Sequence, residues 1–237
     1  GVTAYPRPVE HSYMPAFVPG ESCASVLGAA LGIPVHRLSH QECHLLAGVW
    51  SAGGPISEQF IGVHVSGGTT EILTASAKDG GFEIDIVGQA VDIHAGQLVD
   101  RVGVALGLPF PAGPHLESLA LLCDEPTLVP LSVSRSKISF SGPESHAMRL
   151  IARGENRACL ARGIETCIAD SISIAVTDAV YNKQIFDILF FGVVMANLFI
   201  RSRVQKQLLD TGAKLFFPDN KYSPDNAVGA AFFALRQ

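Results

Sequence analysis

Two histidines are spaced so that they could share one metal ion. His40 and His44 lie four positions apart, and Ser39 and Glu42 form an S-x-x-E capping box that predicts a helix starting at His40. Residues four apart share one face of a helix, so their imidazoles could hold one ion. With eight histidines in the chain, chance gives on the order of 0.3 such pairs. A polar surface pair is therefore the alternative interpretation. His36 is expected on the preceding strand and would not share that face.

Asp225 is the candidate for a third ligand. Ser223 and Pro224 are typical of a helix cap and a first helical residue, which places Asp225 in the first turn of a predicted helix over 224–235. Its carboxylate would complete a mixed nitrogen and oxygen site with the two histidines. The alternative is ordinary stabilisation of the helix dipole by an acidic residue.

A second kind of site is suggested by two glycine-containing segments. The sequence VSGGTT at 65–70 is a Gly-Gly turn flanked by hydroxyls, and its open amides could accept a phosphate. The alternative is a plain hairpin turn. Gly192 and Asn197 lie between a predicted strand end and a helix start, where α/β folds bind ligands. That signal is weak by itself.

The remaining patterns predict the elements that would position these residues. Residues 1–20 are rich in Pro and Gly and are expected to form a loop. Strands are predicted at 33–38, 60–65, 70–75, 82–89, 186–192 and 214–217. Helices are predicted at 21–31, from 40 onward, and at 95–106, 156–180, 196–209 and 224–235. Strands and helices alternate in the second half, so the predicted class is α/β with a mixed sheet.

Composition narrows the function classes. The 237 residues carry a net charge of −5, which argues against a broad basic face, so any RNA contact should be local or assisted by a partner. Five cysteines without a C-x-x-C pair, and no signal peptide in residues 1–10, indicate reduced thiols and a cytoplasmic location. The apolar run at 185–200 is interrupted by Asp187 and Asn197 and is short for a membrane span, so no membrane association is expected.

Taken together and in order, these segments resemble the threonylcarbamoyl-adenosine transferases of tRNA modification, formerly labelled glycoproteases. Six segments carry the resemblance: HQECH (40–44) is similar to the metal motif HxEGH, VSGGTTE (65–71) to VSGGHTQ, GQLVDR (96–101) with LGLPFPAGP (106–114) to GEAFDK and its following run, ISFSG (138–142) to FSFSG, FGVVMAN (191–197) to GGVxAN, and PDNA (224–227) to TDNA. They span about residues 20–235. The resemblance implies an actin-like, sugar-kinase-like fold with mixed sheets and flanking helices.

The resemblance also implies roles for single residues. His40, His44 and Asp225 would hold one divalent metal, iron or zinc, acting as a Lewis acid. Val65, Ser66, Gly67 and Gly68 would contact the phosphates of an adenine nucleotide or of threonylcarbamoyl-adenylate. Asp100, Gly113 and Asn197 would hold its sugar and adenine. The amino group of a tRNA adenine would attack, with no covalent protein nucleophile. The peptidase label lacks support, because HExxH proteases place Glu beside the first His, whereas Glu42 is one position further on.

Several positions depart from the family pattern. Cys43 replaces a glycine and either adds a soft ligand or fills space. Glu71 replaces a glutamine and is expected to bring an acid near the phosphates. Phe191 replaces a glycine and is expected to narrow the nucleotide cleft. In the segment 92–101 an acidic pair is reduced to one aspartate. The family's first phosphate loop, GIETSCDET, has no counterpart here, so an incomplete N-terminal lobe is expected.

Two hypotheses follow from this resemblance. In the first, the chain is a metal-dependent threonylcarbamoyl transferase, or a degenerate paralogue, working on tRNA with partner proteins. In the second, it is a non-catalytic actin-like partner that pairs with a related subunit or with itself. The expected organisation is an N-terminal lobe remainder at 1–58, which carries the H-x-x-x-H helix, and a C-terminal lobe at 59–237, whose last helix could return to the first lobe.

Overall fold

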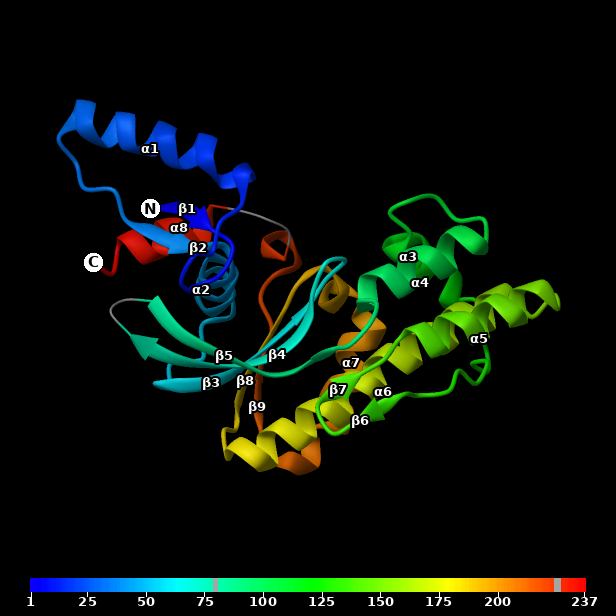
Figure 1. Ribbon diagram of the computed structural model, residues 1–237. Coiled ribbons are helices and arrows are strands. Elements are labelled where there is room, and N and C mark those ends of the chain that lie inside the picture. The colour runs from blue at the N-terminus through cyan, green and yellow to red at the C-terminus, as the bar shows by residue number, and fades with distance from the viewer. Residues whose placement is uncertain (79–80, 224–226) are drawn as a thin grey trace.

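A mixed β-sheet forms the centre of the molecule in the computed structural model, which describes residues 1–78, 81–223 and 227–237 (Figure 1). The strands are β1 (Val2–Tyr5), β2 (Arg37–Ser39), β3 (Gln59–Val65), β4 (Thr70–Lys78), β5 (Gly81–Ala90), β6 (Val133–Ser134), β7 (Lys137–Ile138), β8 (Asp187–Phe191) and β9 (Lys214–Phe216). The α-helices are α1 (Val18–Leu31), α2 (His40–Ala52), α3 (Ala95–Ala105), α4 (Gly113–Ala120), α5 (Ser141–Ala152), α6 (Arg157–Lys183), α7 (Leu198–Gln207) and α8 (Val228–Ala234). Short 3-10 turns are η1 (Pro15–Phe17), η2 (Val193–Ala196), η3 (Leu209–Thr211) and η4 (Asn220–Tyr222).

The large sheet has the strand order β6-β7-β5-β4-β3-β8-β9. Strands β3, β4 and β5 pair antiparallel, as do β6 and β7, whereas β3 with β8, β8 with β9, and β5 with β7 pair parallel. Strands β1 and β2 form a separate parallel pair. The expected α/β class with a mixed sheet is confirmed.

Helices cover both faces of the large sheet, and alternating side chains divide its core in two. Ile188 and Phe190 of β8 belong to a larger apolar cluster with α3, α4, α5, α6 and α7. Leu189 and Phe191 belong to a smaller cluster with α2 and α8. Successive side chains of a strand point to opposite faces, so one apolar strand can serve both cores. The prediction of a buried strand at 186–192 is confirmed for residues 188–191, whereas Asp187 is half-buried and Phe186 is exposed.

Helix α2 begins where the capping box predicts. The backbone N–H of Glu42 donates to Ser39 Oγ at 3.1 Å, and Ser39 N–H donates to Glu42 Oε2 at 2.9 Å. Glu42 Oε1 also accepts from the backbone N–H of Phe82 on β5, at 3.4 Å. The helix ends at Gly53, whose φ of 66° is the left-handed conformation that favours glycine.

Strands β3 and β4 form the predicted hairpin, with Val65 opposite Thr70. In the turn, Ser66 N–H donates to the carbonyl of Thr69 at 2.7 Å, and Thr69 N–H donates to Ser66 Oγ at 3.1 Å. A Cβ atom at Gly67 or Gly68 would meet no other atom within 4 Å. The turn is therefore held by its hydroxyl residue while its glycines stay open to an approaching group.

Some predicted elements are wrong, and some were missed. Residues 1–20 were expected to form a loop but contain β1, η1 and the start of α1. Strand β1 was missed because it pairs with a strand more than 30 positions away and leaves no local signal. The strand expected at 33–38 is shorter and lies at 37–39. Helices α4 and α5 follow Pro-rich or short polar segments that were not predicted as helical. Helix α8 starts at Val228, and the first residues of the predicted helix, 224–226, lie outside the described residues.

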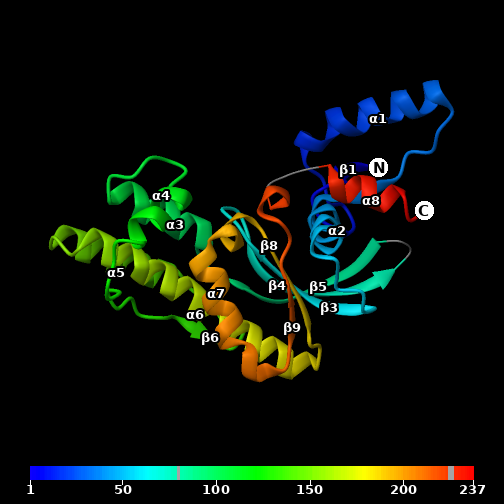
Figure 2. The same cartoon turned by 180° about the vertical axis from the view of Figure 1, so that it is seen from behind.

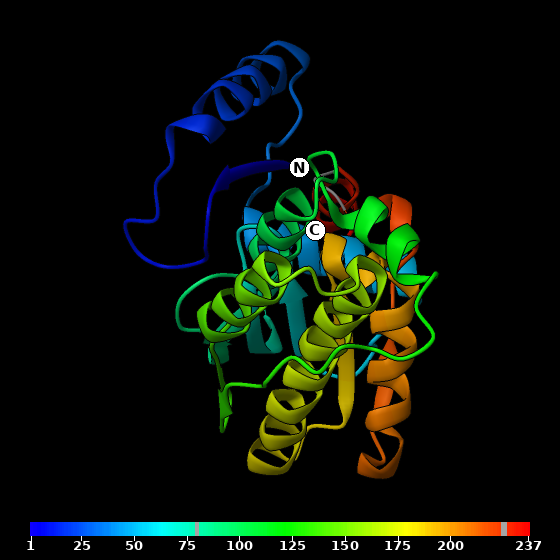
Figure 3. The same cartoon turned by 90° about the vertical axis from the view of Figure 1, so that its right-hand side faces the viewer.

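Helix α1 stands apart from the sheet and contacts chiefly β1 and η1, as seen from three sides (Figures 1, 2 and 3). Gly28 is its one buried residue. Among the described residues, no helix combines the length and apolar character that crossing a bilayer requires.

Candidate nucleotide cleft and histidine pair

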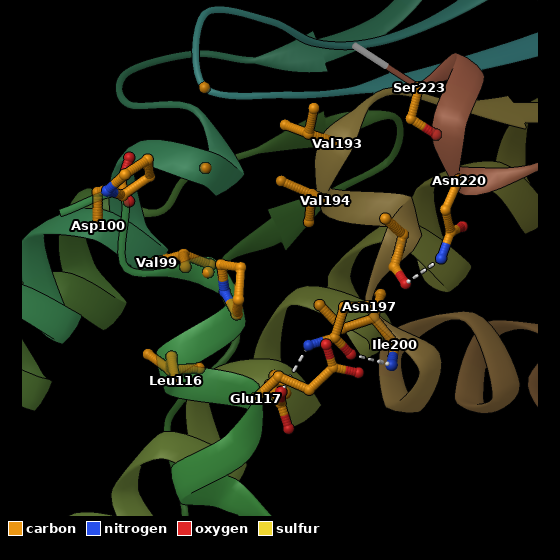
Figure 4. Close-up of a pocket in the computed structure, with 17 residues that line it drawn as sticks. Val99, Asp100, Leu116, Glu117, Val193, Val194, Asn197, Ile200, Asn220 and Ser223 are labelled. Atoms are coloured by element: carbon orange, nitrogen blue, oxygen red, sulfur yellow. Dashed lines mark hydrogen bonds between the residues drawn. The ribbon is translucent and has the colours of Figure 1, made fainter. Parts of the chain in front are cut away.

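A cavity of about 550 Å³ lies between the β3–β4 turn, α3, α4 and the η2–α7 segment (Figure 4). Four of the predicted ligand residues line it: Gly67, Asp100, Gly113 and Asn197. Val65 is fully buried in the larger core instead. Ser66 and Gly68 stay in the turn beside the cavity, and within the described chain they do not line it. Residues from four separate segments are thus brought to one cleft.

Helix α3 is seated directly on the β3–β4 turn. Gly96 N–H donates to the carbonyl of Ser66 at 3.1 Å. A Cβ atom at Gly96 would lie 2.6 Å from Cα of Gly67, closer than any real contact. Only glycine lets the helix start and the turn approach this closely. One helical turn later, Asp100 Oδ1 accepts from the backbone N–H of Ala112 at 2.8 Å and fixes the segment that leads into α4.

A buried carboxylate lies behind Asn197. Asn197 Nδ2 donates to Glu165 Oε1 at 2.6 Å, and Asn197 Oδ1 accepts from Ile200 N–H at 2.9 Å, which caps α7 (Figure 4). Arg162 donates to Glu165 Oε2, also at 2.6 Å. Burial raises the pKa of Glu165 to about 7, against the opposing effects of Asn197 and Arg162. The Asn197 side chain is therefore oriented by α6 and already occupied at its oxygen.

Sequence reasoning did not single out Glu165. The available signal was a charged residue on the buried face of α6, one position from Ile164 and three from Ile168. Without the packing of α7 on α6, that position cannot be distinguished from an exposed one.

The structure brings the two histidines together at the start of α2. Nε2 of His44 lies 3.2 Å from Nε2 of His40, and the ring centroids are 4.5 Å apart. Two imidazole nitrogens bound to one tetrahedral zinc ion at about 2.05 Å would lie about 3.3 Å apart. The spacing of the two nitrogen atoms is therefore close to that of two ligands of one ion, and it is also the spacing of an N–H···N hydrogen bond between the rings.

A third histidine, His64, lies beside this pair. Its ring centroid is 5.3 Å from that of His44, and it stacks on Phe191 with centroids 4.7 Å apart. Burial, followed by the neighbouring His44 and His40, lowers the pKa of His64 to about 3. The prediction that Phe191 narrows the nucleotide cleft is wrong: its ring lies in the smaller core on the α2 face of the sheet.

Glu71 is paired rather than free to repel phosphates. Its Oε1 accepts a close hydrogen bond from Arg7, and its Oε2 accepts from Nε2 of Gln41 at 3.3 Å. The Arg7 guanidinium offsets the charge of this buried carboxylate, and the expectation that Glu71 brings an acid near the phosphates stays a prediction. Glu71 joins the N-terminal segment, the histidine helix and the turn strand.

Asp225 lies outside the described residues, so its place relative to the histidines stays a prediction. Within the described chain, no group of three or more His, Cys, Asp or Glu side chains could hold a metal. Gly229, four positions later, is pressed against α2: a Cβ atom there would lie 1.9 Å from the carbonyl oxygen of Cys43, between the two histidines. Cys43 is buried in the smaller core.

Sequence comparison identifies relatives over nearly the whole chain. The family model described as tRNA N6-adenosine threonylcarbamoyltransferase matches residues 14–232. Proteins of that name from Dichelobacter nodosus and Aromatoleum aromaticum are 32% and 29% identical to this chain. The matches cover 94% and 92% of this chain, and 67% and 65% of those proteins. The chain thus spans about two thirds of the length of these relatives.

Structural comparison supports the fold. HypF of T. kodakarensis superposes with a TM-score of 0.70 at 14% identity, over 94% of this chain and 39% of that one. The activator of 2-hydroxyisocaproyl-CoA dehydratase from Clostridium difficile gives 0.54 at 15% identity, over 84% and 68%. These likenesses confirm the actin-like class implied by the motifs. The extent of the family match shows that this chain is a member of the tRNA N6-adenosine threonylcarbamoyltransferase family.

Proposed function

We propose that this chain binds an adenylate in the cleft and takes part in threonylcarbamoyl transfer to a tRNA adenine. The observation that carries the proposal is the cavity itself, in which Gly67, Asp100, Gly113 and Asn197 converge. Family membership supplies the reaction class. The cavity volume of about 550 Å³ lies within the usual range of small-molecule sites.

Different residues of the cleft would bind different parts of the adenylate. The backbone N–H groups of Gly67 and Gly68 suit the phosphate, because neither residue has a side chain in the way. Those of Ser66 and Thr69 already donate within the turn. Asp100 and Asn197 also line the cavity and would hold the sugar and the base. The tRNA amine attacks the carbamoyl carbon, the bond from that carbon to the phosphate oxygen breaks, the amine loses one proton, and AMP leaves.

His40, His44 and Asp225 would hold a divalent metal, iron or zinc. When bound, such an ion supplies Lewis-acid polarisation of the carbamoyl and phosphate oxygens. Two observations support this ligand set. The Nε2 atoms of the histidines are 3.2 Å apart. Gly229, four positions after Asp225, packs on the backbone of Cys43 between them.

The test measures metal content and transfer separately. Elemental analysis of the purified chain should give about one metal ion per chain, lost in the His40→Ala/His44→Ala variant and retained in Cys43→Gly. Transfer of labelled threonylcarbamoyl from the adenylate to a tRNA transcript should fall in an Asp100→Ala variant that keeps its metal. Equal metal content in wild type and the double variant would overturn the metal assignment. Unchanged transfer in Asp100→Ala would overturn the adenylate site.

A second candidate is a non-catalytic role in pairing with a related actin-like subunit or a second copy. Helix α1 favours it, because Val26, Leu27 and Leu31 are 54–68% exposed on an element that contacts little of its own chain. Exposed apolar side chains gathered on one helix mark an interaction surface. A Val26→Asp/Leu27→Asp variant that dissociates in ultracentrifugation, with metal content intact, would support the pairing role.

A further inference from the structure

A second cavity, remote from the cleft, gathers positive charge. It measures about 610 Å³ and lies between the β6–β7 hairpin, β5 and the end of α6. Arg135, Lys137 and Lys183 line it with Ser134 and Asn182. Among the described residues none of these three cations forms an ion pair. The chain as a whole is acidic, at −5, so this cluster is a local exception.

In the part of the chain that the structure describes, Asp178, the acidic residue of the cavity, does not form an ion pair with any of the three cations. Asp178 lines the same wall, and its Oδ2 accepts from Ser136 Oγ at 2.6 Å. That bond ties the hairpin to α6, and the wall keeps a formal excess of two positive charges from three cations and one carboxylate. We call the set Arg135, Lys137 and Lys183 the basic groove.

The backbone at Arg135 adopts a conformation in which a large side chain is strained. Arg135 is the first residue of the two-residue turn between β6 and β7, with φ of 54°. Such turns favour glycine or asparagine at left-handed positions, since a larger residue there is strained. A long cation thus occupies a turn position that glycine would fill with less strain.

We propose that the basic groove binds the phosphodiester backbone of RNA. Arginine, lysine, serine and asparagine are among the side chains that contact nucleic-acid phosphates. The cavity is lined by aliphatic but no aromatic side chains within the described chain, so it offers no platform for stacking bases. The groove therefore holds RNA without regard to sequence.

The position of the groove fits an RNA that also reaches the cleft. Helix α6 connects the two sites, with Glu165 at the cleft and 178–183 at the groove. At about 1.5 Å per residue they lie roughly 20–27 Å apart along the helix axis. That distance corresponds to roughly six to eight nucleotides at about 3.4 Å each. The inference rests on the proposed function in taking tRNA as the RNA concerned.

The test measures binding of an in vitro transcribed tRNA by fluorescence anisotropy at salt concentrations from roughly 0.05 to 0.3 M, over which electrostatic binding weakens steeply. The variant is Arg135→Gln/Lys137→Gln/Lys183→Gln, and the matched control is Lys78→Gln/Arg149→Gln/Lys206→Gln, with the same change in charge. A plot of the logarithm of the association constant against the logarithm of the salt concentration has a negative slope, and each lost phosphate contact reduces its magnitude by about 0.7. The groove variant should lose about 2 from that slope and bind on the order of 50-fold more weakly at 0.15 M salt, whereas the control should not.

A single substitution separates binding from folding. Arg135→Gly removes a cation and the strained backbone together, so it should raise the melting temperature while it weakens tRNA binding. Equal loss in the groove and control variants would overturn the groove and leave the proposed transfer intact. No salt-dependent tRNA binding by the wild-type chain would overturn both the groove and the tRNA part of the proposed function.

Discussion

The buried carboxyl group of Glu165 should make the stability of this protein depend on pH in a direction unusual for an acid. Its side chain is fully buried, and burial raises its pKa from 4.5 to about 7. Between these values the folded chain holds a proton that the unfolded chain has released. Stability is therefore greatest below pH 4.5 for this group, and it falls as pH rises to about 7.

The size of the effect follows from the shift. A rise from 4.5 to about 7 is about 2.5 units, which at 1.36 kcal/mol per unit gives about 3 kcal/mol. Glu165→Gln keeps the shape and an oxygen that can accept from Asn197, but it cannot ionise. Urea unfolding followed by circular dichroism should show the variant gaining about 3 kcal/mol relative to wild type between pH 5 and 8. Parallel pH profiles for the two proteins would refute the reasoning.

Three further substitutions test the packing. Gly96→Ala would place a methyl 2.6 Å from the β3–β4 turn, so it should cost about 1–3 kcal/mol and weaken ATP binding in calorimetry. Its control is Gly142→Ala, at the same position of α5, where a Cβ atom meets nothing within 4 Å. Ile188→Asp should cost about 3 kcal/mol or more by burying an unpaired charge, and an unchanged melting temperature would contradict the buried strand. Gly229→Ala should push α8 off α2 and weaken metal binding in a titration, whereas Gly142→Ala should not.

Local sequence was sufficient for the elements that carry their own signals. The capping box at Ser39 and Glu42 placed the start of α2, and the Gly-Gly turn placed the β3–β4 hairpin. Both depend on residues within a few positions of each other. The histidine pair followed from helix geometry alone, because four positions on one helix fix which side chains meet.

Contacts between distant segments could not be predicted in the same way. Asn197 and Glu165 are 32 positions apart, and their hydrogen bond exists only because α7 packs on α6. The Arg7–Glu71 pair joins residues 64 positions apart. Phe191 was assigned to the wrong side of the sheet because the alternation of β8 gives the two faces but not which helices cover each one.

The division of the core has a consequence for how this protein opens. The helix that carries His40 and His44 belongs to the smaller apolar cluster, whereas α6 runs through the larger one. Regions with fewer buried apolar contacts unfold locally at lower free energy. Amide hydrogens of α2 and α8 should therefore exchange with solvent sooner than those of α6 and β8. A metal ion that joined the two histidines would slow exchange in α2 first, so the cluster with the weaker packing would gain most from the ligand.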